Sequence, residues 1–431
     1  MHSETHGTSA GSAEECSVSS LTAGNTTVTD KQDADNDGLY DFQLFLSQLK
    51  DPCADPILRY TKSFLHNFSS QKQQWRATEQ QKLVNDFKLF IYDKFTAYEP
   101  FKSLDATRLA NAKEGIEKLV MGKLYTKCFS PCLKNEAGKL DQEHQQDLDQ
   151  DDQLRKKILE YKFIEPSHME IASELSPKLD TFVKMSAGEL EKINNYKAPR
   201  DKIVCVLNSC KVIFAFLKHS KLDVSGADIF LPLLIYTLIK SDVQALVSNV
   251  KYIERFRLPD FLQGESAYYL SSVQGAINYI LEMDKTSLNI NDVEAFELKY
   301  NQNQEQLSQS KLLNEQSQST ALAGAAPMSP SSYILRPLDE AANNLLNLVS
   351  EFLTSKSGTP IDDNSKSLGG EIDEETATRL AKNMEHKEHL QIRQNLQAMF
   401  PNIDPGVIQD VCIASKYRIG VCVDSLLSLM D

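Results

Sequence analysis

Apolar residues recur every three or four positions along most of this chain. In the segment that closes at Pro100 they are Leu83, Val84, Phe87, Phe90, Ile91 and Phe95. The same spacing returns in RLANAKEGIEKLVMGKLYTKCF and in DKIVCVLNSCKVIFAFLKHS. This period places apolar side chains on one face of an α-helix. Alternating runs punctuated by Asn-Gly or Asp-Gly, which would indicate strands, do not occur. We therefore predict an all-α fold.

Changes in composition divide the chain into five segments. We predict a disordered acidic tail over 1–41, a helical bundle over 42–178 and a second all-helical domain over 179–290. A flexible linker over 291–375, rich in Gln, Ser, Ala and Pro, carries one amphipathic helix near 338–353. That helix would either bind a partner or pack back on the nearest domain. A compact three-helix domain is expected over 376–431.

The charge balance argues against nucleic-acid binding, and the N-terminus argues against secretion. Lys and Arg number 46 and Asp and Glu number 60, which gives a net charge of −14. Because nucleic-acid affinity comes mostly from clustered cations, we expect no nucleic-acid binding. The N-terminus lacks the basic start and apolar core of a signal peptide. The longest apolar run, Ile229 to Ile235, is too short to span a bilayer, so we expect a cytoplasmic protein without a transmembrane segment.

Motifs of covalent catalysis and of metal binding are missing. The chain has no Gly-rich phosphate loop, no G-x-S-x-G and no H-E-x-x-H. Its eight cysteines are scattered, and we interpret them as buried thiols. His386 and His389 share a helix face, but no carboxylate or thiol completes a metal site. We therefore predict no cofactor and no metal.

The stretch SGADIFLPLLIYTLI, Ser225 to Ile239, places a carboxylate and a proline in an apolar run. Ser225 and Asp228 fit the S-x-x-D pattern of a capping box, so Asp228 would help to start a helix. Pro232 would cost a helix interior roughly 3 kcal/mol. It is therefore expected in or near the first turn, or at a kink.

Four motifs between Tyr196 and Asp284 carry a family resemblance: YKAPRDKIVCVLNSCKVI, SGADIFLPLLIYTLIKS, VSNVKYIERFR and GESAYYLSSVQGAINYI. This stretch resembles the catalytic domain of the vacuolar-protein-sorting "Vps-nine" family, whose members are guanine nucleotide exchange factors for early-endosomal Rab GTPases. The preceding segment, with EGIEKLVMGKLYTKCF, resembles the helical bundle that braces this domain. The segment 179–290 is then the exchange domain, which catalyses GDP/GTP exchange without covalent chemistry.

The resemblance assigns five residues to the contact with the GTPase nucleotide site and switch regions: Asp228, Pro232, Glu265, Tyr268 and Ser271. It implies that Asp228 is the acid that disturbs the bound Mg²⁺ and phosphate. Ser271 departs from the Thr that is more frequent in the family. Two alternatives stay open from the residues themselves: Asp228 as a helix cap only, and Glu265 as a first-turn acid that the helix dipole favours.

The C-terminal segment resembles a CUE domain, a small three-helix ubiquitin binder. Met399, Phe400 and Pro401 match its Met-Phe-Pro motif, and Leu426 and Leu427 match its di-leucine. The resemblance implies that these residues contact ubiquitin; the alternative is that they form the core of a small bundle. Because so small a unit has little interior, we expect at least some of them to be exposed.

The order of bundle, exchange domain, linker and terminal CUE domain resembles the fungal member of the family. We expect an exchange factor for early-endosomal, Rab-five-type GTPases that is cytoplasmic and is recruited to endosomal membranes through ubiquitinated cargo. The alternative is a non-catalytic ubiquitin adaptor with a degenerate exchange domain. A further hypothesis is that the tail or the 338–353 helix covers the exchange surface until ubiquitin binds.

Overall fold

The computed structural model describes the backbone of residues 40–71, 74–134, 140–219, 226–321, 386 and 389–429. Side chains are described for these residues except 174, 176–178, 219, 226–228, 310–321 and 427. Every regular element in this part of the chain is helical, which confirms the predicted class. The N-terminal tail up to residue 39 and the predicted helix at 338–353 lie outside the described residues.

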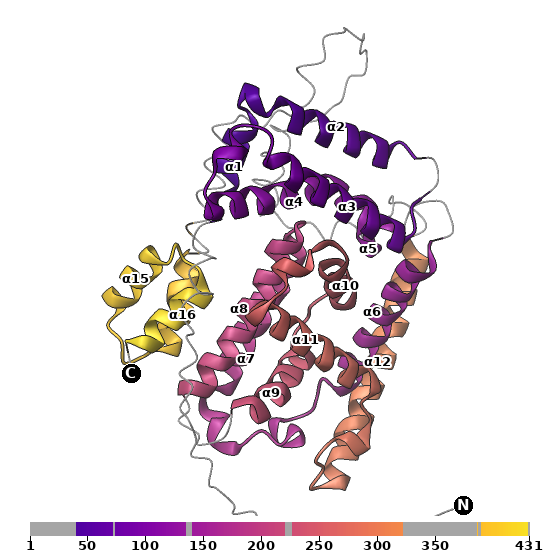
Figure 1. Cartoon of the computed structure of the whole chain (residues 1–431). Coiled ribbons are helices and arrows are strands. Elements are labelled where there is room, and N and C mark those ends of the chain that lie inside the picture. Colours follow the sequence, from indigo (N-terminus) through magenta and orange to yellow (C-terminus); the bar gives the residue numbers. More distant parts are fainter. Residues whose placement is uncertain are drawn as a thin grey trace, which may run out of the picture. The chain divides into compact units, whose positions relative to one another are not determined.

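The N-terminal helices form a bundle with an aromatic core (Figure 1). They are α1 (Phe42–Leu49), α2 (Asp55–Ser69), α3 (Ala77–Phe95), α4 (Ala106–Cys128) and the short α5 (Ser130–Leu133). The helix α1 packs on α4 where Gly115 leaves room for the ring of Phe45. A Cβ atom at Gly115 would lie 2.3 Å from Cγ of Phe45, so only glycine allows this approach. The bundle core also takes in Tyr252 and Phe256 from the following domain.

The second group of helices surrounds α8. It comprises α6 (Gln142–Tyr161), α7 (Ser176–Glu191), α8 (Pro199–His219), α9 (Gly226–Lys240), α10 (Leu246–Phe256) and α11 (Gly264–Glu282). The helices α7, α9, α10 and α11 all contact α8 (Figure 1). The apolar core of this group begins at Leu154 in α6, whereas the sequence placed the domain boundary at 178. By its packing, the C-terminal half of α6 therefore belongs with the second domain.

A buried network of ion pairs joins the bundle to the end of α10, and we call it the brace. Arg257, which caps α10, donates to Glu114 at 2.6 and 2.7 Å and to Glu117 at 2.9 Å, both on α4. Lys88 of α3 approaches Glu117 at 3.4 Å and donates to the carbonyl of Phe256. Burial lowers the pKa of Lys88, and Glu117 opposes this effect. The brace holds four charges with little access to water.

A second polar cluster ties α5 and α6 to α10. Arg255 donates to both carboxylate oxygens of Asp147 on α6, one of them at 3.0 Å. Ser130 donates to the same carboxylate at 2.6 Å and lies 2.8 Å from Nδ1 of His144. Burial, together with nearby Arg255, lowers the pKa of His144 to about 4, so the imidazole is neutral at physiological pH. Ser130, His144 and Asp147 are buried and Arg255 is half-buried. The cluster therefore connects the helices and is not an accessible site.

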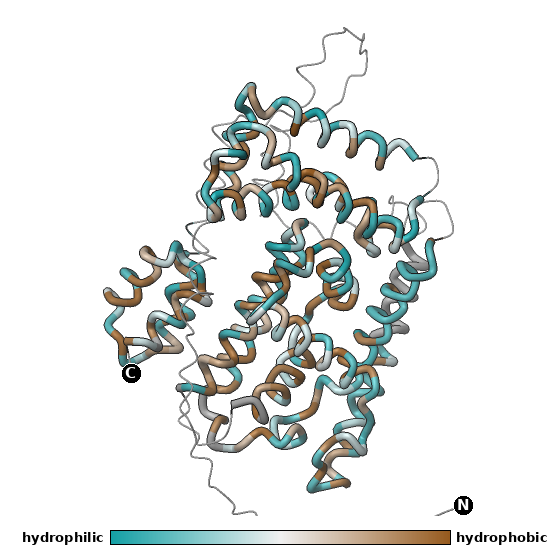
Figure 2. Tube along the Cα trace, in the orientation of Figure 1, coloured by the Kyte–Doolittle hydropathy of each residue, from teal (hydrophilic) through white to brown (hydrophobic). Residues whose placement is uncertain are grey.

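The predicted linker begins with a long helix, α12 (Val293–Ala321), so the prediction of a flexible chain from residue 291 was wrong over this range. In Figure 1 α12 runs beside α6. Tyr300 donates to Glu160 at 2.7 Å, and Asn303 donates to the Glu160 carbonyl at 2.9 Å. Gln, Glu and Leu are good helix formers, and these anchors on α6 hold the polar helix in place. Figure 2 shows the contrast between the largely hydrophilic α6 and α12 and the more hydrophobic α8 and α9.

The C-terminal domain contains helical residues 389–399, then α15 (Pro405–Ala414) and α16 (Ile419–Ser428). Asp404 caps α15 by accepting a hydrogen bond from the N–H of Gly406 at 2.7 Å, and Pro405 occupies the first helical position. Lys416 and Tyr417 have positive φ angles of 51° and 56° and turn the chain into α16. The breaks predicted at FPNIDPG and KYRIG are therefore confirmed.

Candidate functional site

The helix α9 begins at Gly226, so position 228 is in its first turn and position 225 precedes the helix. This is the register of the predicted capping box, although Ser225 and the side chain of Asp228 lie outside the described residues. Pro232 lies inside α9. It is therefore not in the first turn, which was one of the positions expected for it. In an α-helix the N–H of residue 232 pairs with the carbonyl of residue 228, and proline has no N–H. The proline therefore removes one backbone partner from Asp228.

Three predicted residues share one face of α11. Glu265, Tyr268 and Ser271 are spaced by three positions, which places them on neighbouring turns of a helix. All three are exposed, and Tyr268 keeps 47% of its surface accessible. The hydroxyl of Ser271 donates to the carbonyl of Ala267 at 2.8 Å, so its oxygen still has acceptor capacity toward solvent. Glu265 is in the first turn of α11, as the dipole argument also predicts.

The first turns of α9 and the exposed face of α11 meet through aromatic contacts. The ring of Phe230 lies 6.1 Å from that of Tyr268 at an interplanar angle of 27°, and 4.4 Å from that of Phe214 on α8. Beside it, Leu231 keeps 41% of its surface exposed. We use the name α9/α11 surface for Leu231, Pro232, Glu265, Tyr268 and Ser271 together with backbone position 228. It is an apolar patch with acidic groups at its edge.

Lys211 of α8 is the cation closest to this acidic edge that the structure records. Its ammonium lies 3.3 Å from a carboxylate oxygen of Glu265 and 3.4 Å from one of Asp424 on α16. Burial would lower the pKa of Lys211, but the two carboxylates keep this pKa above its usual value, and Asp424 has the larger effect of the two. Lys211 therefore stays charged and connects the edge of the α9/α11 surface to the C-terminal domain.

The predicted ubiquitin contacts are mostly buried in this arrangement. Met399 and Leu426 are 0% exposed and Phe400 is 2% exposed, whereas Pro401 is exposed. The side chain of Leu427 lies outside the described residues. The expectation that so small a unit leaves part of its motif exposed thus holds only for Pro401. The reason is that the apolar core of this domain is continuous with that of the second domain.

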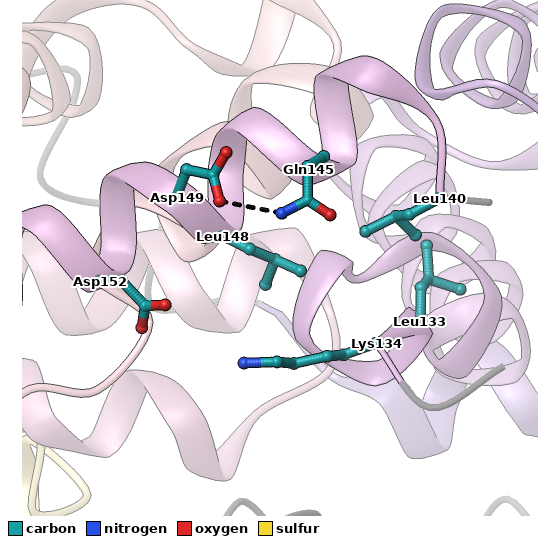
Figure 3. A pocket seen from close by; sticks show the side chains of 7 residues that line it. All are labelled: Leu133, Lys134, Leu140, Gln145, Leu148, Asp149 and Asp152. Carbon is teal, nitrogen blue, oxygen red and sulfur yellow. Dashed lines mark hydrogen bonds between the residues drawn. The ribbon is translucent and has the colours of Figure 1, made fainter.

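A separate hollow of about 200 Å³ lies between α5 and α6 (Figure 3). Leu133, Leu140 and Leu148 line it together with polar side chains, and Gln145 donates to Asp149 at 2.9 Å. No residue predicted as functional lines this hollow. In the part of the chain that is described, no three His, Cys, Asp or Glu side chains are grouped as metal ligands. Nor does any described helix combine the length and apolar character that crossing a bilayer requires.

Sequence reasoning missed Leu231 and Lys211. Leu231 belongs to an apolar run whose members are mostly core, and only the helix register singles it out as exposed. Lys211 is one cation in the helical stretch NSCKVIF. Its partners are 54 and 213 positions away in sequence, so no local pattern could have indicated them.

Three protein families match parts of the chain. The Vacuolar sorting protein 9 (VPS9) domain matches residues 183–285, and the CUE domain matches residues 389–429. A domain of unknown function, DUF5601, matches residues 59–125 in the bundle. The first match contains α8 to α11 and therefore the whole α9/α11 surface.

Curated relatives agree with these matches. Vacuolar protein sorting-associated protein vps901 of Schizosaccharomyces pombe is 40% identical over 287 residues, 67% of this chain and 49% of its own length. Vacuolar protein sorting-associated protein 9A of Arabidopsis thaliana is 32% identical over 60% of this chain and 47% of its own length. The Rab5 GDP/GTP exchange factor of Homo sapiens is 28% identical over 54% of this chain and 45% of its own length. These alignments span about half of each relative. The chain carries a VPS9 domain followed by a CUE domain.

Proposed function

We propose that this chain is a guanine nucleotide exchange factor that releases GDP from a Rab5-type GTPase and binds ubiquitin through its CUE domain. The VPS9 domain and the human relative named as a Rab5 GDP/GTP exchange factor support the first activity. The CUE domain supports the second. The observation that carries the proposal is the α9/α11 surface, where exposed Leu231 and Tyr268 flank the first turn that contains Asp228.

The proposed mechanism uses one carboxylate and no covalent step. A GTPase holds GDP through a phosphate loop, its lysine and Mg²⁺. The exchange factor binds the nucleotide-free GTPase tightly. Because coupling between two ligands is reciprocal, GDP and the exchange factor weaken each other's binding to the same extent. A carboxylate delivered to this pocket repels the β-phosphate and pairs with the lysine once phosphate and metal have left. Asp228, in the first turn of a helix, is proposed for this role.

The other residues of the surface are proposed to bind rather than to disturb the nucleotide. Leu231 and Tyr268 offer apolar area to the switch regions, since Tyr supplies a large contact at small entropic cost. Pro232 fixes the backbone next to the acid, and its ring is partly accessible. Glu265 and Ser271 supply hydrogen-bond acceptors at the edge.

The same proposal gives the protein a place in the cell. A cytoplasmic exchange factor would reach early endosomes through its CUE domain, by binding ubiquitinated cargo there. CUE-sized contacts are small and weak, so recruitment would depend on several ubiquitins or on tethering to the membrane. Transport of vesicles to the endosome and vacuole would then be the process it serves.

Release of a fluorescent GDP analogue from a panel of purified Rab GTPases tests this function. We expect acceleration with Rab5-type members, and Asp228→Ala should slow it by about 10- to 100-fold, the loss of one charge-assisted contact. The matched control is Glu294→Ala, which removes an acid from the first turn of α12. Unchanged release with a folded Asp228→Ala variant would contradict the mechanism.

The alternative function is that of a ubiquitin adaptor whose VPS9 domain is a scaffold. It predicts no acceleration with any Rab while ubiquitin binding persists. Titration of labelled ubiquitin against the same preparation provides that second measurement.

A further inference from the structure

The CUE domain contacts the VPS9 domain through α16 and α8, within one compact unit from Tyr40 to Asp431. We call this contact the dock. Its polar part is the pair between Lys211 and Asp424 at 3.4 Å. The two helices approach tightly at Gly420, where a Cβ atom would lie 2.9 Å from Oδ1 of Asn208 and 3.1 Å from Cδ of Lys211. Two helices thus meet at a glycine, as tightly packed pairs often do.

The apolar part of the dock is continuous with both cores. Buried CUE residues form one cluster with buried residues of α8, among them Val212, Ile213 and Phe216. Met399, Phe400 and Leu426 belong to that cluster. The CUE match spans only residues 389–429. A domain of that size has little interior, so complete burial of Met399, Phe400 and Leu426 together is unexpected for the domain alone. Packing against a neighbour accounts for it.

We propose that α8 is a docking surface for the CUE domain, and that docking and ubiquitin binding exclude each other. The inference rests on the proposed binding of ubiquitin by this domain. Ubiquitin needs Met399, Phe400 and Leu426 to be accessible, and all three are buried in the docked arrangement. Ubiquitin therefore selects the undocked population, and its apparent dissociation constant rises by the reciprocal of the undocked fraction.

The composition of the dock fits a contact that opens. Asp424 keeps 56% of its side chain exposed, so its pair with Lys211 contributes little stability. A hollow of about 200 Å³ remains between α8 and the CUE domain, lined by Asn208 and Val204 on one side and by Ile392 and Ile419 on the other. In sequence, residues 322–385 lie between the end of α12 and His386, the next described residue.

Gly420→Arg in the full chain tests the proposal. The side chain would collide with α8, and its charge would repel Lys211. We expect ubiquitin to bind this variant at least about threefold more tightly than wild type, as measured by fluorescence titration. Lys211→Glu should also tighten ubiquitin binding. Because this substitution lies outside the CUE domain, its effect does not depend on whether a CUE-domain variant folds correctly. The control is Gly188→Arg, a helical glycine with no neighbour within 4 Å of its Cβ position.

The outcomes separate this inference from the proposed function. Equal ubiquitin affinity for wild type, Gly420→Arg and Lys211→Glu would overturn the docking inference while leaving ubiquitin binding intact. Absence of binding in all of them would overturn ubiquitin binding itself, and the inference with it.

A reversible cross-link provides the converse test. The Cβ position of residue 420 lies 3.9 Å from Cγ of Asn208, so the side chains of Asn208→Cys and Gly420→Cys are close enough for an attempt at a disulfide between them. Oxidation should abolish ubiquitin binding, and a thiol reductant should restore it. Ubiquitin binding by the fully cross-linked chain, or failure of the pair to cross-link, would contradict the proposal.

Discussion

The VPS9 domain meets its two neighbours through very different contacts. On the bundle side, the brace buries Arg257 to 7% exposure against Glu117 at 1%. On the CUE side, the dock pairs Lys211, at 19%, with Asp424, at 56%. Both contacts are salt bridges of ordinary length. They differ in how much of each charged side chain is exposed to water.

Access to water decides whether a contact can open. Removing one partner of a buried pair leaves a charge without water or counter-ion and costs about 3–5 kcal/mol. Exposed pairs are worth about 0–1 kcal/mol, because water replaces the partner. The brace therefore holds the bundle and the VPS9 domain together more strongly than the ion pair of the dock holds the CUE domain.

Arg257→Met should have the largest effect. It removes the hydrogen bonds that Arg257 gives to Glu114 and leaves Lys88 as the nearest cation of buried Glu117, and we expect the free energy of unfolding to fall by about 3–5 kcal/mol. Urea denaturation can follow Trp75, the chain's single tryptophan. That indole donates to the Phe68 carbonyl at 3.2 Å and so reports on the bundle.

A surface pair in the bundle serves as the control. Arg59 contacts Asp55 at 3.0 Å with side-chain exposures of 72% and 38%. Arg59→Met should cost less than about 0.5 kcal/mol. If Arg257→Met cost no more than this control, the brace would not hold the two domains together.

An intermediate effect is expected at Asp151, a half-buried carboxylate of α6 for which no ion pair is recorded among the described residues. It accepts hydrogen bonds from the N–H groups of Val247 and Ser248 at the start of α10, and from the Ser248 hydroxyl. Burial raises the pKa of Asp151 from 3.8 to about 6, although these hydrogen bonds act against it. Its charged form is therefore less stable in the folded chain than in the unfolded one.

The pH dependence follows from that direction. The folded chain keeps this proton up to about pH 6 and the unfolded chain loses it near pH 4, so stability falls as pH rises through that window. The loss is roughly 3 kcal/mol, and Asp151→Asn should not show it. Urea unfolding of both proteins from pH 4 to pH 7 measures the difference. Parallel pH profiles would contradict the role of burial.

The helical class could be predicted because it depends on local patterns. Apolar spacing of three to four residues identified the helices, and Pro100, FPNIDPG and KYRIG identified breaks. The polar α12 was missed because its stability comes from Tyr300 and Asn303 contacting α6, more than a hundred positions earlier. Composition alone does not encode such anchors.

The candidate site shows the same limit. The family resemblance predicted Glu265, Tyr268 and Ser271, and the structure places them on one exposed face. The exposure of at least some of the ubiquitin-motif residues was predicted from domain size, which takes no account of a neighbouring helix. The motifs EGIEKL and YIERFR carried the resemblance, yet Glu114, Glu117 and Arg257 build the brace and not the site. A resemblance identifies such residues without giving their role.

The smallest effect is expected at the dock itself. Asp424→Asn removes an exposed charge, so the free energy of unfolding should change by less than about 0.5 kcal/mol. The docked population should nevertheless become less sensitive to salt, because salt screens the pair between Lys211 and Asp424 and not the apolar contact around it. The rate of disulfide formation between Asn208→Cys and Gly420→Cys reports that population. It should fall as ionic strength rises when Asp424 is present, and fall less in the Asp424→Asn background. Equal salt dependence in both backgrounds would show that the pair contributes nothing to docking, and that the apolar face of α8 alone holds the CUE domain.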